Sequence, residues 1–307
     1  MTRFWVELSG ENRPLALAEL EGATRALGGA ISAPPDLPDS ITGSFVAVDL
    51  AGRASATALA DRLALAWMVV EPWPEEGAEE IAGRLVREGR RGRSAAFRPF
   101  GRPRGPVRSI PVARLADAYR RGGGSIDLTT PDQRFFIAES PGGRFHFAEE
   151  VGSVDRTAFE RRRLPTFPFR RPVSLPPKLG RVAANLGAVR PGDRVLDPFV
   201  GTGALAAEAA LLGARMSGVD VDATMVRGAI QNLAHVGLEF ESITASDAAV
   251  AARDYSGPAF DALISDPPYG RSSGSRGEPP ENLLERTIPA WAPAVRAGGR
   301  IVLVVPG

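Results

Sequence analysis

The chain has 307 residues, of which 44% are hydrophobic and 24% are charged, and its formal net charge is +1. This composition is typical of a globular protein with two or three domains. The lack of cysteine excludes disulfides and thiolate metal sites, and two histidines leave little for a histidine-based centre, so we expect no metal. No stretch reaches the roughly 18 apolar residues of a membrane span, and the first residues lack the order of a signal peptide. We therefore expect a cytoplasmic protein without a membrane partner, and a monomer is the working expectation, which the sequence does not determine.

Charge is separated along the chain although the net value is small. Residues 84–121 contain 12 arginines against two acidic residues, whereas residues 195–285 contain 13 acidic residues against 5 arginines. A basic stretch of one sign is typical of a surface that binds a polyanion, and its separation from an acidic half indicates two different tasks. The pattern predicts a part that binds RNA or DNA, joined to a part with another function.

Residues 1–72 are expected to form a small α+β domain of ferredoxin-like type. Strand patterns at 3–8, 45–50 and 66–70 alternate with helical patterns at 15–27 and 55–65, and a proline-rich loop spans 29–40. Helices packed on one sheet form a stable two-layer arrangement. This region shows no residue pattern that indicates catalysis.

Residues 73–152 carry the basic cluster and are predicted to bind RNA. A helix is expected over 75–88, an arginine-rich loop then leads into a strand that contains Phe97 and Phe100, and a second helix is expected over 112–121. Guanidinium groups suit phosphates, so we assign the arginines to nucleic-acid contact, whereas core positions are the better interpretation for the two phenylalanines. The arginines assigned to RNA are Arg90, Arg91, Arg93, Arg98, Arg102 and Arg104.

A polar turn between two strand patterns follows the second helix. Its sequence, Ile-Asp-Leu-Thr-Thr-Pro-Asp over 126–132, resembles the signature of the THUMP domain, an RNA-binding module of tRNA-modifying enzymes. The resemblance implies that Asp127 and Asp132 fix the turn and are not themselves a site. It also makes tRNA the expected partner of the arginine cluster.

A linker rich in proline and arginine is predicted over 153–172, and residues 173–307 are predicted to form an α/β domain with a doubly wound, mostly parallel, Rossmann-like sheet. Strands are expected at 194–197, 216–220, 241–244, 260–265 and 300–305, with helices between the earlier ones. The carboxyl ends of parallel strands share one edge, where such sheets bind their ligands. The carboxylates expected at that edge are Asp197, Asp220, Asp247 and Asp266.

The loop after the first of these strands favours S-adenosylmethionine over a dinucleotide. Residues 201–206, Gly-Thr-Gly-Ala-Leu-Ala, also fit the dinucleotide fingerprint, with Asp220 at the ribose position. A pyrophosphate would lie at the following helix N-terminus, where Asp197 would repel it. S-adenosylmethionine carries a sulfonium and an ammonium but no phosphate, which suits Asp197; Asp220 can accept the ribose hydroxyls and Asp247 the adenine amino group. An NAD oxidoreductase is therefore the weaker alternative.

The fourth strand ends in Asp266-Pro267-Pro268-Tyr269. Two prolines cannot continue the hydrogen-bond ladder of a central strand, so the chain must leave the sheet there and present Asp266 and Tyr269 at its edge. Carbonyl acceptors beside a flat ring suit a planar group with N–H donors. A nucleobase amino group is such a group.

The stretches 197–203 and 266–269 together resemble the paired signature of class I amino methyltransferases. Residues 171–186 and 268–273 are similar to one branch of them, the THUMP-containing tRNA guanosine-10 N2-methyltransferases, chiefly archaeal. The resemblance covers about residue 80 to the end. It implies methyl transfer from S-adenosylmethionine to N2 of a guanosine in tRNA, with a catalytic set of Asp266, Pro267, Pro268 and Tyr269. The cofactor contacts it implies are Asp197, Pro198, Phe199, Gly201, Thr202, Gly203, Asp220, Val221, Asp247 and Lys178.

Two further functions stay open on the sequence alone. A DNA methyltransferase acting on adenine or cytosine shares the Asp-Pro-Pro-Tyr pattern, and a test with DNA and tRNA substrates separates the two. A non-catalytic RNA-binding protein is the other alternative, because the family's sheet continues with an antiparallel pair whereas this sequence ends after its fifth predicted strand, without the last two. Binding of S-adenosylmethionine tests that alternative.

Overall fold

The computed structural model describes residues 1–33, 37, 43–87, 91–100, 111–162, 167–171, 174–255, 257–268 and 278–305. The chain forms two compact units. The first comprises Met1–Ala16, Gly28–Asp61 and Ala66–Val154, and the second comprises Leu17–Leu27, Arg62–Leu65 and Asp155–Gly307. Two short pieces of the first 72 residues thus belong to the second unit.

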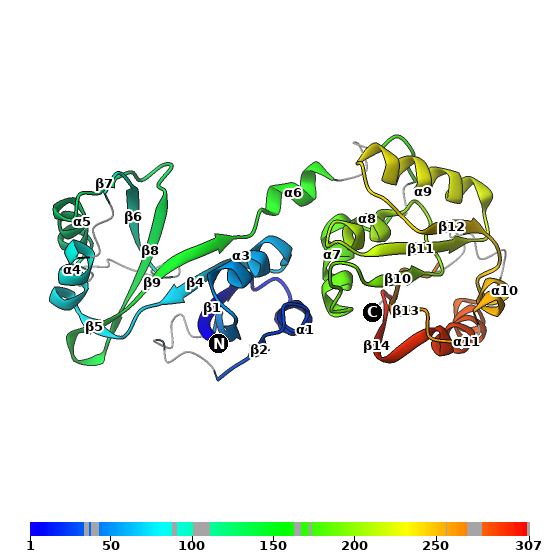
Figure 1. The fold of residues 1–307 in the computed structure, drawn as a ribbon, viewed down its shortest axis with the longest axis horizontal. Coiled ribbons are helices and arrows are strands. Elements are labelled where there is room, and N and C mark those ends of the chain that lie inside the picture. The colour runs from blue at the N-terminus through cyan, green and yellow to red at the C-terminus, as the bar shows by residue number, and fades with distance from the viewer. Residues whose placement is uncertain are drawn as a thin grey trace. The chain divides into compact units, whose positions relative to one another are not determined.

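One mixed sheet runs through the first unit, in the order β2-β3-β1-β4-β9-β8-β6-β7, with β5 paired to β9 (Figure 1). β6 pairs in parallel with β7 and β8, and the other pairs are antiparallel. Because β4 pairs with β9, the regions before and after residue 72 share this sheet. The elements of this part of the chain are β1 (Thr2–Leu8), α1 (Arg13–Ala26), β2 (Ala30–Ile31), β3 (Phe45–Leu50), α3 (Arg53–Arg62), β4 (Ala66–Pro72), β5 (Glu76–Gly77), α4 (Ala78–Arg87), β6 (Ser94–Pro99), α5 (Val112–Arg121), β7 (Ser125–Ile126), β8 (Gln133–Ser140), η1 (Pro141–Gly143) and β9 (Arg144–Ser153).

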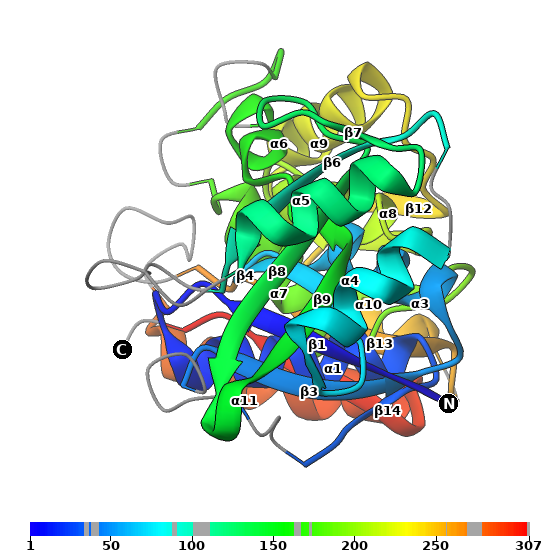
Figure 2. The ribbon, with the colours of Figure 1, turned by 90° about the vertical axis from the view of Figure 1, so that its left-hand side faces the viewer.

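Alternation along the strands gives this sheet two apolar faces. In β8, Phe135 and Ile137 join the core beneath α4 and α5, whereas Phe136 and Ala138 point to the core on the other face. Figure 2, which faces this unit, shows α4 and α5 side by side. Phe97 is buried in the first core and Phe100 in the second, so their predicted core positions are confirmed.

The second unit contains a five-stranded parallel sheet in the order β12-β11-β10-β13-β14. The order reverses between β10 and β13, as in a doubly wound α/β fold. Its elements beyond residue 154 are α6 (Arg156–Arg161), α7 (Pro177–Leu186), β10 (Arg194–Asp197), α8 (Ala204–Ala210), β11 (Arg215–Asp220), α9 (Ala223–His235), β12 (Ser242–Ala245), α10 (Ala248–Ala251), η3 (Ala252–Asp254), β13 (Phe260–Ser265), α11 (Pro280–Trp291), η4 (Ala292–Ala294) and β14 (Val295–Leu303).

Helices cover both faces of the parallel sheet (Figure 1). Val195 and Ile264 belong to a core with residues of α7, α8 and α9. The neighbouring Leu196 and Leu263 belong to a separate core with residues of α10 and α11, including the fully buried Trp291. This three-layer arrangement explains why neighbouring residues in β10 and β13 are apolar, because both faces of the sheet are buried. The predicted α/β class with a Rossmann-like parallel sheet is confirmed.

A buried polar cluster explains why Leu17–Leu27 and Arg62–Leu65 belong to the second unit. The Glu19 carboxylate is fully buried and accepts hydrogen bonds from the backbone N–H groups of Ala64 and Leu65 and from the Asn185 amide. Arg62 donates from Nε to Asn185 and from Nη2 to the Val189 carbonyl. Since buried polar groups need partners, these bonds hold α1 and the 62–65 turn against α7.

Some predicted elements differ from the structure. A linker rich in proline and arginine was predicted over 153–172, and the structure shows that β9 continues to Ser153 and that Asp155 caps the short helix α6 within this stretch. None of the helices within the described ranges combines the length and the hydropathy needed to cross a membrane.

Candidate active site

A cleft of about 500 Å³ opens at the carboxyl edge of the parallel sheet, across the point where the strand order reverses. Open α/β sheets bind ligands in this position. Among the described residues that line it, six are carboxylates and two are arginines. The charged lining consists of Asp197, Asp220, Asp222, Asp247, Asp266, Glu278, Arg171 and Arg286. The structure thus brings together the four carboxylates singled out from the sequence.

Asp197 lies at the end of β10 and is almost completely buried. Its Oδ1 accepts a hydrogen bond from Ser265 Oγ at 2.5 Å and another from the backbone N–H of Phe199 at 3.0 Å. Burial raises the pKa of Asp197 to about 7, and these two bonds oppose the shift. Ser265 and the Phe199 backbone are both neutral donors, so a cationic ligand in the cleft would favour the ionised form of Asp197.

The loop after β10 is held by Asp220 at the end of β11. Asp220 accepts hydrogen bonds from the backbone N–H groups of Gly201, at 3.0 Å, and of Asp222, at 2.8 Å. Gly203 closes the loop with φ of 80° and begins α8, and a Cβ there would lie 3.2 Å from Ala229 Cβ. Glycine is therefore required both by the left-handed backbone and by the neighbouring helix. The pKa of Asp220 is raised, chiefly by burial.

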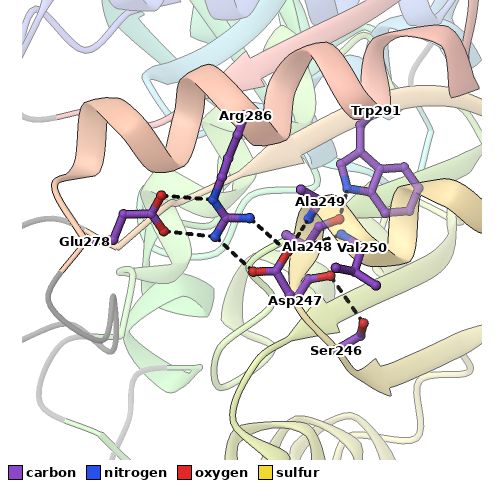
Figure 3. A network of polar contacts seen from close by, with 8 residues as sticks. All are labelled: Ser246, Asp247, Ala248, Ala249, Val250, Glu278, Arg286 and Trp291. Carbon is purple, nitrogen blue, oxygen red and sulfur yellow. Dashed lines mark hydrogen bonds and ion pairs between the residues drawn. The ribbon is translucent and has the colours of Figure 1, made fainter.

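Asp247, which follows β12, is already engaged in an ion pair (Figure 3). Its carboxylate caps α10 and also contacts the Arg286 guanidinium, which contacts Glu278 on its other side. The bonds with Arg286 are the main reason that the pKa of Asp247 is lowered. The expected role of Asp247 toward adenine must therefore be shared with this arginine.

The chain leaves the sheet after β13 as predicted from its prolines. Asp266 is half-buried, Pro267 is buried, and both line the cleft together with Pro268. Burial raises the pKa of Asp266 to about 6. Tyr269 lies outside the described residues.

The side-chain amide of Asn232, on α9, fixes the segment that precedes the α/β domain. The Asn232 amide donates to the carbonyls of Phe169 and Thr202 and accepts from the backbone N–H of Phe169. The Phe169 ring lies so close to Gly228 that a Cβ there would be 2.0 Å from it. Arg171 lies over the same ring, 5.3 Å from its centroid, and lines the cleft. One amide therefore ties the glycine loop to the segment that carries Arg171.

Two predicted cofactor residues do not line this cleft. Gly203 lines a smaller adjacent cavity, and Lys178 lies half-buried on α7 without being part of the cleft wall. The other eight predicted contacts, Asp197, Pro198, Phe199, Gly201, Thr202, Asp220, Val221 and Asp247, line it.

The predicted RNA contacts lie in the first unit, apart from those outside the described residues, which are Arg90, Arg102 and Arg104. Arg91, Arg93 and Arg98 are exposed. The nearby turn is rigid, since Asp127 accepts bonds from Thr129 and Thr130 and Asp132 accepts from Ser94 at the start of β6. The predicted architectural role of the two aspartates is confirmed.

Sequence reasoning missed five residues of the site: Ser265, Asn232, Arg171, Glu278 and Arg286. Ser265 stands directly before the Asp-Pro-Pro run, so its position was a usable signal. The hydrogen bonds of Asn232 and the ion pair of Arg286 join residues far apart in sequence, and no local sequence pattern predicts such contacts.

The lining suits a ligand that carries positive charge. A buried aspartate with neutral partners, backbone turns held by carboxylates and an excess of acidic groups fit a sulfonium and an ammonium better than a phosphate. Among the described residues, no group of three or more histidines or carboxylates is arranged to hold a metal ion.

Comparisons with known proteins agree with this chemistry. Residues 166–307 match the family model described as RMKL-like, methyltransferase domain. The chain is 37% identical over 163 residues to the tRNA (guanine(10)-N2)-dimethyltransferase of Methanothermobacter thermautotrophicus, covering 53% of this chain and 48% of that protein. It is 38% identical over 148 residues to the enzyme of the same name from Pyrococcus abyssi, covering 48% and 44% of the two chains. The chain is thus homologous to these archaeal methyltransferases.

Weaker similarity is found to two further proteins. The tRNA (guanine(10)-N(2))-methyltransferase of Saccharomyces cerevisiae is 30% identical over 166 residues, which cover 48% of this chain and 38% of that protein. The solved structure of TrmN from Thermus thermophilus aligns over 98% of this chain and 88% of that chain, with 23% identity and a TM-score of 0.43. The aligned part spans less than half the length of each of these three curated relatives.

Proposed function

We propose that this homologue of the tRNA (guanine(10)-N2)-methyltransferases transfers a methyl group from S-adenosylmethionine to the exocyclic N2 of a guanosine in tRNA. The observation that carries the proposal is that Asp266-Pro267-Pro268 and the buried Asp197 line one cleft. The relatives' names supply the substrate and nucleotide 10. One or two methyl groups are consistent with those names.

Three aspartates along the cleft would each hold a different part of the cofactor. Asp197 faces the cationic amino-acid portion, Asp220 accepts the ribose hydroxyls, and Asp247 accepts from the adenine amino group. When bound, S-adenosylmethionine supplies a methyl group activated on sulfur. The protein's own contribution is to hold the acceptor nitrogen in line with it, and positioning of this kind accounts for much of a transfer rate.

The acceptor is handled by the residues after β13. The lone pair of guanine N2 is delocalised into the ring, so the nitrogen is a poor nucleophile. The base is flipped out of the RNA, as enzymes that act on bases require. Asp266 and the Pro267 carbonyl accept the two amino hydrogens, which favours a pyramidal nitrogen with a directed lone pair. Asp266 stabilises the charge that develops on nitrogen and takes the proton released after transfer.

The tRNA itself is bound by the first unit. Arg91, Arg93 and Arg98 are exposed beside the rigid turn at 127–132, and their guanidinium groups are suited to phosphates. Contacts of this kind position the RNA without reading its sequence. The expected cytoplasmic location remains a prediction.

A substrate comparison tests the proposal. The purified chain is incubated with labelled S-adenosylmethionine and either unmodified tRNA or duplex DNA, and cofactor binding is measured by calorimetry in parallel. We expect binding and label in tRNA. Label in DNA would replace the proposed substrate, and failure to bind the cofactor would contradict the methyltransferase assignment.

A further inference from the structure

Arg286 lies between two carboxylates at the edge of the cleft (Figure 3). Its Nη1 and Nη2 donate to Oδ1 and Oδ2 of Asp247 at 2.8 and 2.9 Å. Its Nε and Nη2 donate to Oε1 and Oε2 of Glu278, both at 2.9 Å. The guanidinium is thus bound on two of its edges by paired hydrogen bonds, a geometry that fixes its orientation.

The backbone beneath this arginine is also fixed. Arg286 belongs to α11, and Trp291 of the same helix donates from its indole N–H to the carbonyl of Ala248 at 2.8 Å. Ala248 is the first residue of α10, directly after Asp247. The helix that carries Arg286 is therefore bonded to the same turn as the carboxylate that Arg286 contacts, as Figure 3 shows.

The residues that the structure describes engage the two oxygens of Asp247 unequally. Oδ1 accepts from the backbone N–H groups of Ala249 and Val250 and from Arg286, whereas Oδ2 accepts from Arg286 alone among the described residues. Because a carboxylate oxygen has two lone pairs, Oδ1 is crowded by three donors, and Oδ2 is the oxygen that keeps an acceptor position toward the described part of the chain. The side chain lines the cleft.

We propose that Arg286 is a positioning residue that makes Asp247 an acceptor for a single hydrogen of the cofactor's purine 6-amino group. This inference rests on the proposed function, because it takes the cleft to be the cofactor site. Arg286 occupies the other sides of the carboxylate and prevents it from turning, and Glu278 holds Arg286. Asp247, Arg286 and Glu278 together select an amino group at purine C6.

A carbonyl at the same purine position would be rejected. Its oxygen would face the Oδ2 lone pair without a hydrogen between them, and the fixed carboxylate could not turn away. Without Arg286, the Asp247 carboxylate keeps its cap on α10 but can turn to relieve that contact. Loss of Arg286 should therefore mainly lower the ratio of the affinities for the two purines. Its effect on the folding stability should be the smaller one.

The test measures binding of S-adenosylhomocysteine and S-inosylhomocysteine, which carry an amino and a carbonyl group at C6, to the full chain by calorimetry. For the wild type we expect about 30-fold tighter binding of the amino form, the effect of one hydrogen bond gained and one acceptor left facing another. Arg286→Ala should lower this ratio to about 3-fold, and Arg286→Lys should give an intermediate ratio because an ammonium cannot pair with two carboxylates in this way. The control Arg227→Ala, on the surface of α9, should keep the wild-type ratio.

Other outcomes overturn the inference. A wild-type ratio near one, with normal binding of S-adenosylhomocysteine, would remove it while leaving the proposed function intact. An unchanged ratio in both Arg286 variants, with a lower melting temperature, would show that the ion pairs only join α11 to α10. Failure of the wild type to bind either compound would overturn the proposed function, and the inference with it.

Discussion

Three aspartates at one sheet edge have different surroundings, and these surroundings separate their roles. Asp197 is buried between neutral donors and its pKa is raised to about 7, whereas burial alone raises the pKa of Asp266 to about 6. The pKa of Asp247 is lowered by Arg286. Groups with perturbed pKa values in a cleft are candidates for function. Here burial raises two of the pKa values and an ion pair lowers the third.

Removing the Asp266 carboxylate should affect turnover and spare cofactor binding. Asp266→Asn keeps the size of the side chain but cannot accept a proton, so we expect kcat to fall by about 100-fold or more. Affinity for S-adenosylhomocysteine should change by less than about 3-fold, because it depends on the other carboxylates. Steady-state kinetics and calorimetry measure the two effects, and normal turnover in the variant would refute the assignment.

The pH dependence of kcat/KM should reflect the ionisation of the Asp266 carboxyl group. Its pKa of about 6 means that the carboxylate loses its acceptor form as the pH falls below that value. With S-adenosylmethionine saturating, so that the cationic cofactor keeps Asp197 ionised, we expect kcat/KM for tRNA to be level above about pH 7 and to decline by up to about 10-fold per unit below pH 6. The residual activity of Asp266→Asn should lack this step. A wild-type profile that stays flat down to pH 5 would contradict the role given to Asp266.

Asp197 should destabilise the ligand-free protein at high pH. Its folded pKa of about 7 exceeds the ordinary value of 3.8, so the folded state binds more protons than the unfolded state between these values. The free energy of unfolding therefore falls as the pH rises from about 4 to about 7. Asp197→Asn should be more stable than the wild type at pH 8, by an amount on the order of a few kcal/mol, and similar to it near pH 4.

Thermal denaturation of both proteins at several pH values measures this effect. The same substitution should weaken S-adenosylmethionine binding, because the cofactor loses an anionic partner. A variant that is less stable than the wild type at pH 8 would show that the Asp197 carboxylate is satisfied without a ligand.

At the scale of single residues, the sequence predicts where a functional side chain lies better than it predicts which side chains it contacts. Carboxylates at strand ends can be recognised because buried strands and turns have local patterns. The charge state of Asp247 depends on Arg286, which is 39 positions away, and the position of Phe169 depends on Asn232, 63 positions away. Such pairs are created by packing, and no period in the sequence encodes them.

At the scale of elements, α9 and the segment before α7 are joined through Gly228. Alanine normally stabilises a helix by about 1 kcal/mol relative to glycine. At this position, however, its Cβ would lie 2.0 Å from the Phe169 ring. We expect Gly228→Ala to displace Phe169 and Arg171, lower the melting temperature and weaken cofactor binding. The matched control is Gly83→Ala in α4, where the nearest atom belongs to the flexible end of Arg87.

Differential scanning fluorimetry with and without S-adenosylhomocysteine compares the two variants. The Gly83 variant should match the wild type in its ligand-induced shift, whereas the Gly228 variant should show a smaller one. Equal shifts in all three proteins would show that the Phe169 segment does not support the cofactor site.

The parallel sheet could be predicted because β10, β11 and β13 are short strands with buried apolar residues that stop at a carboxylate or directly before one. Other elements lack so clear a signal. The polar helix α6 follows a strand without proline or glycine between them. Helix α11 contains Pro289 and begins at Pro280, directly after Pro279, and prolines usually mark irregular structure. β9 is ten residues long and pairs with both β8 and β4, a continuity that depends on contacts far apart in sequence.

At the scale of the whole molecule, RNA binding and chemistry are proposed to belong to different units. Replacing Arg91, Arg93 and Arg98 together by alanine should weaken tRNA binding and reduce its salt dependence, since each phosphate contact contributes about one unit to that slope. Affinity for S-adenosylhomocysteine should be unchanged. Filter binding at several salt concentrations measures the slope, and an equal loss on replacing Arg3, Arg25 and Arg215, three other exposed arginines, would show a general charge effect instead.

The central claim is that this chain methylates N2 of a guanosine in tRNA. The most direct measurement is to incubate it with unmodified tRNA and isotopically labelled S-adenosylmethionine, digest the RNA to nucleosides and identify the labelled one by mass spectrometry. The account predicts label in N2-methylguanosine or N2,N2-dimethylguanosine, and none when guanosine 10 is replaced by adenosine. Label in any other nucleoside, or no label despite bound cofactor, would contradict it.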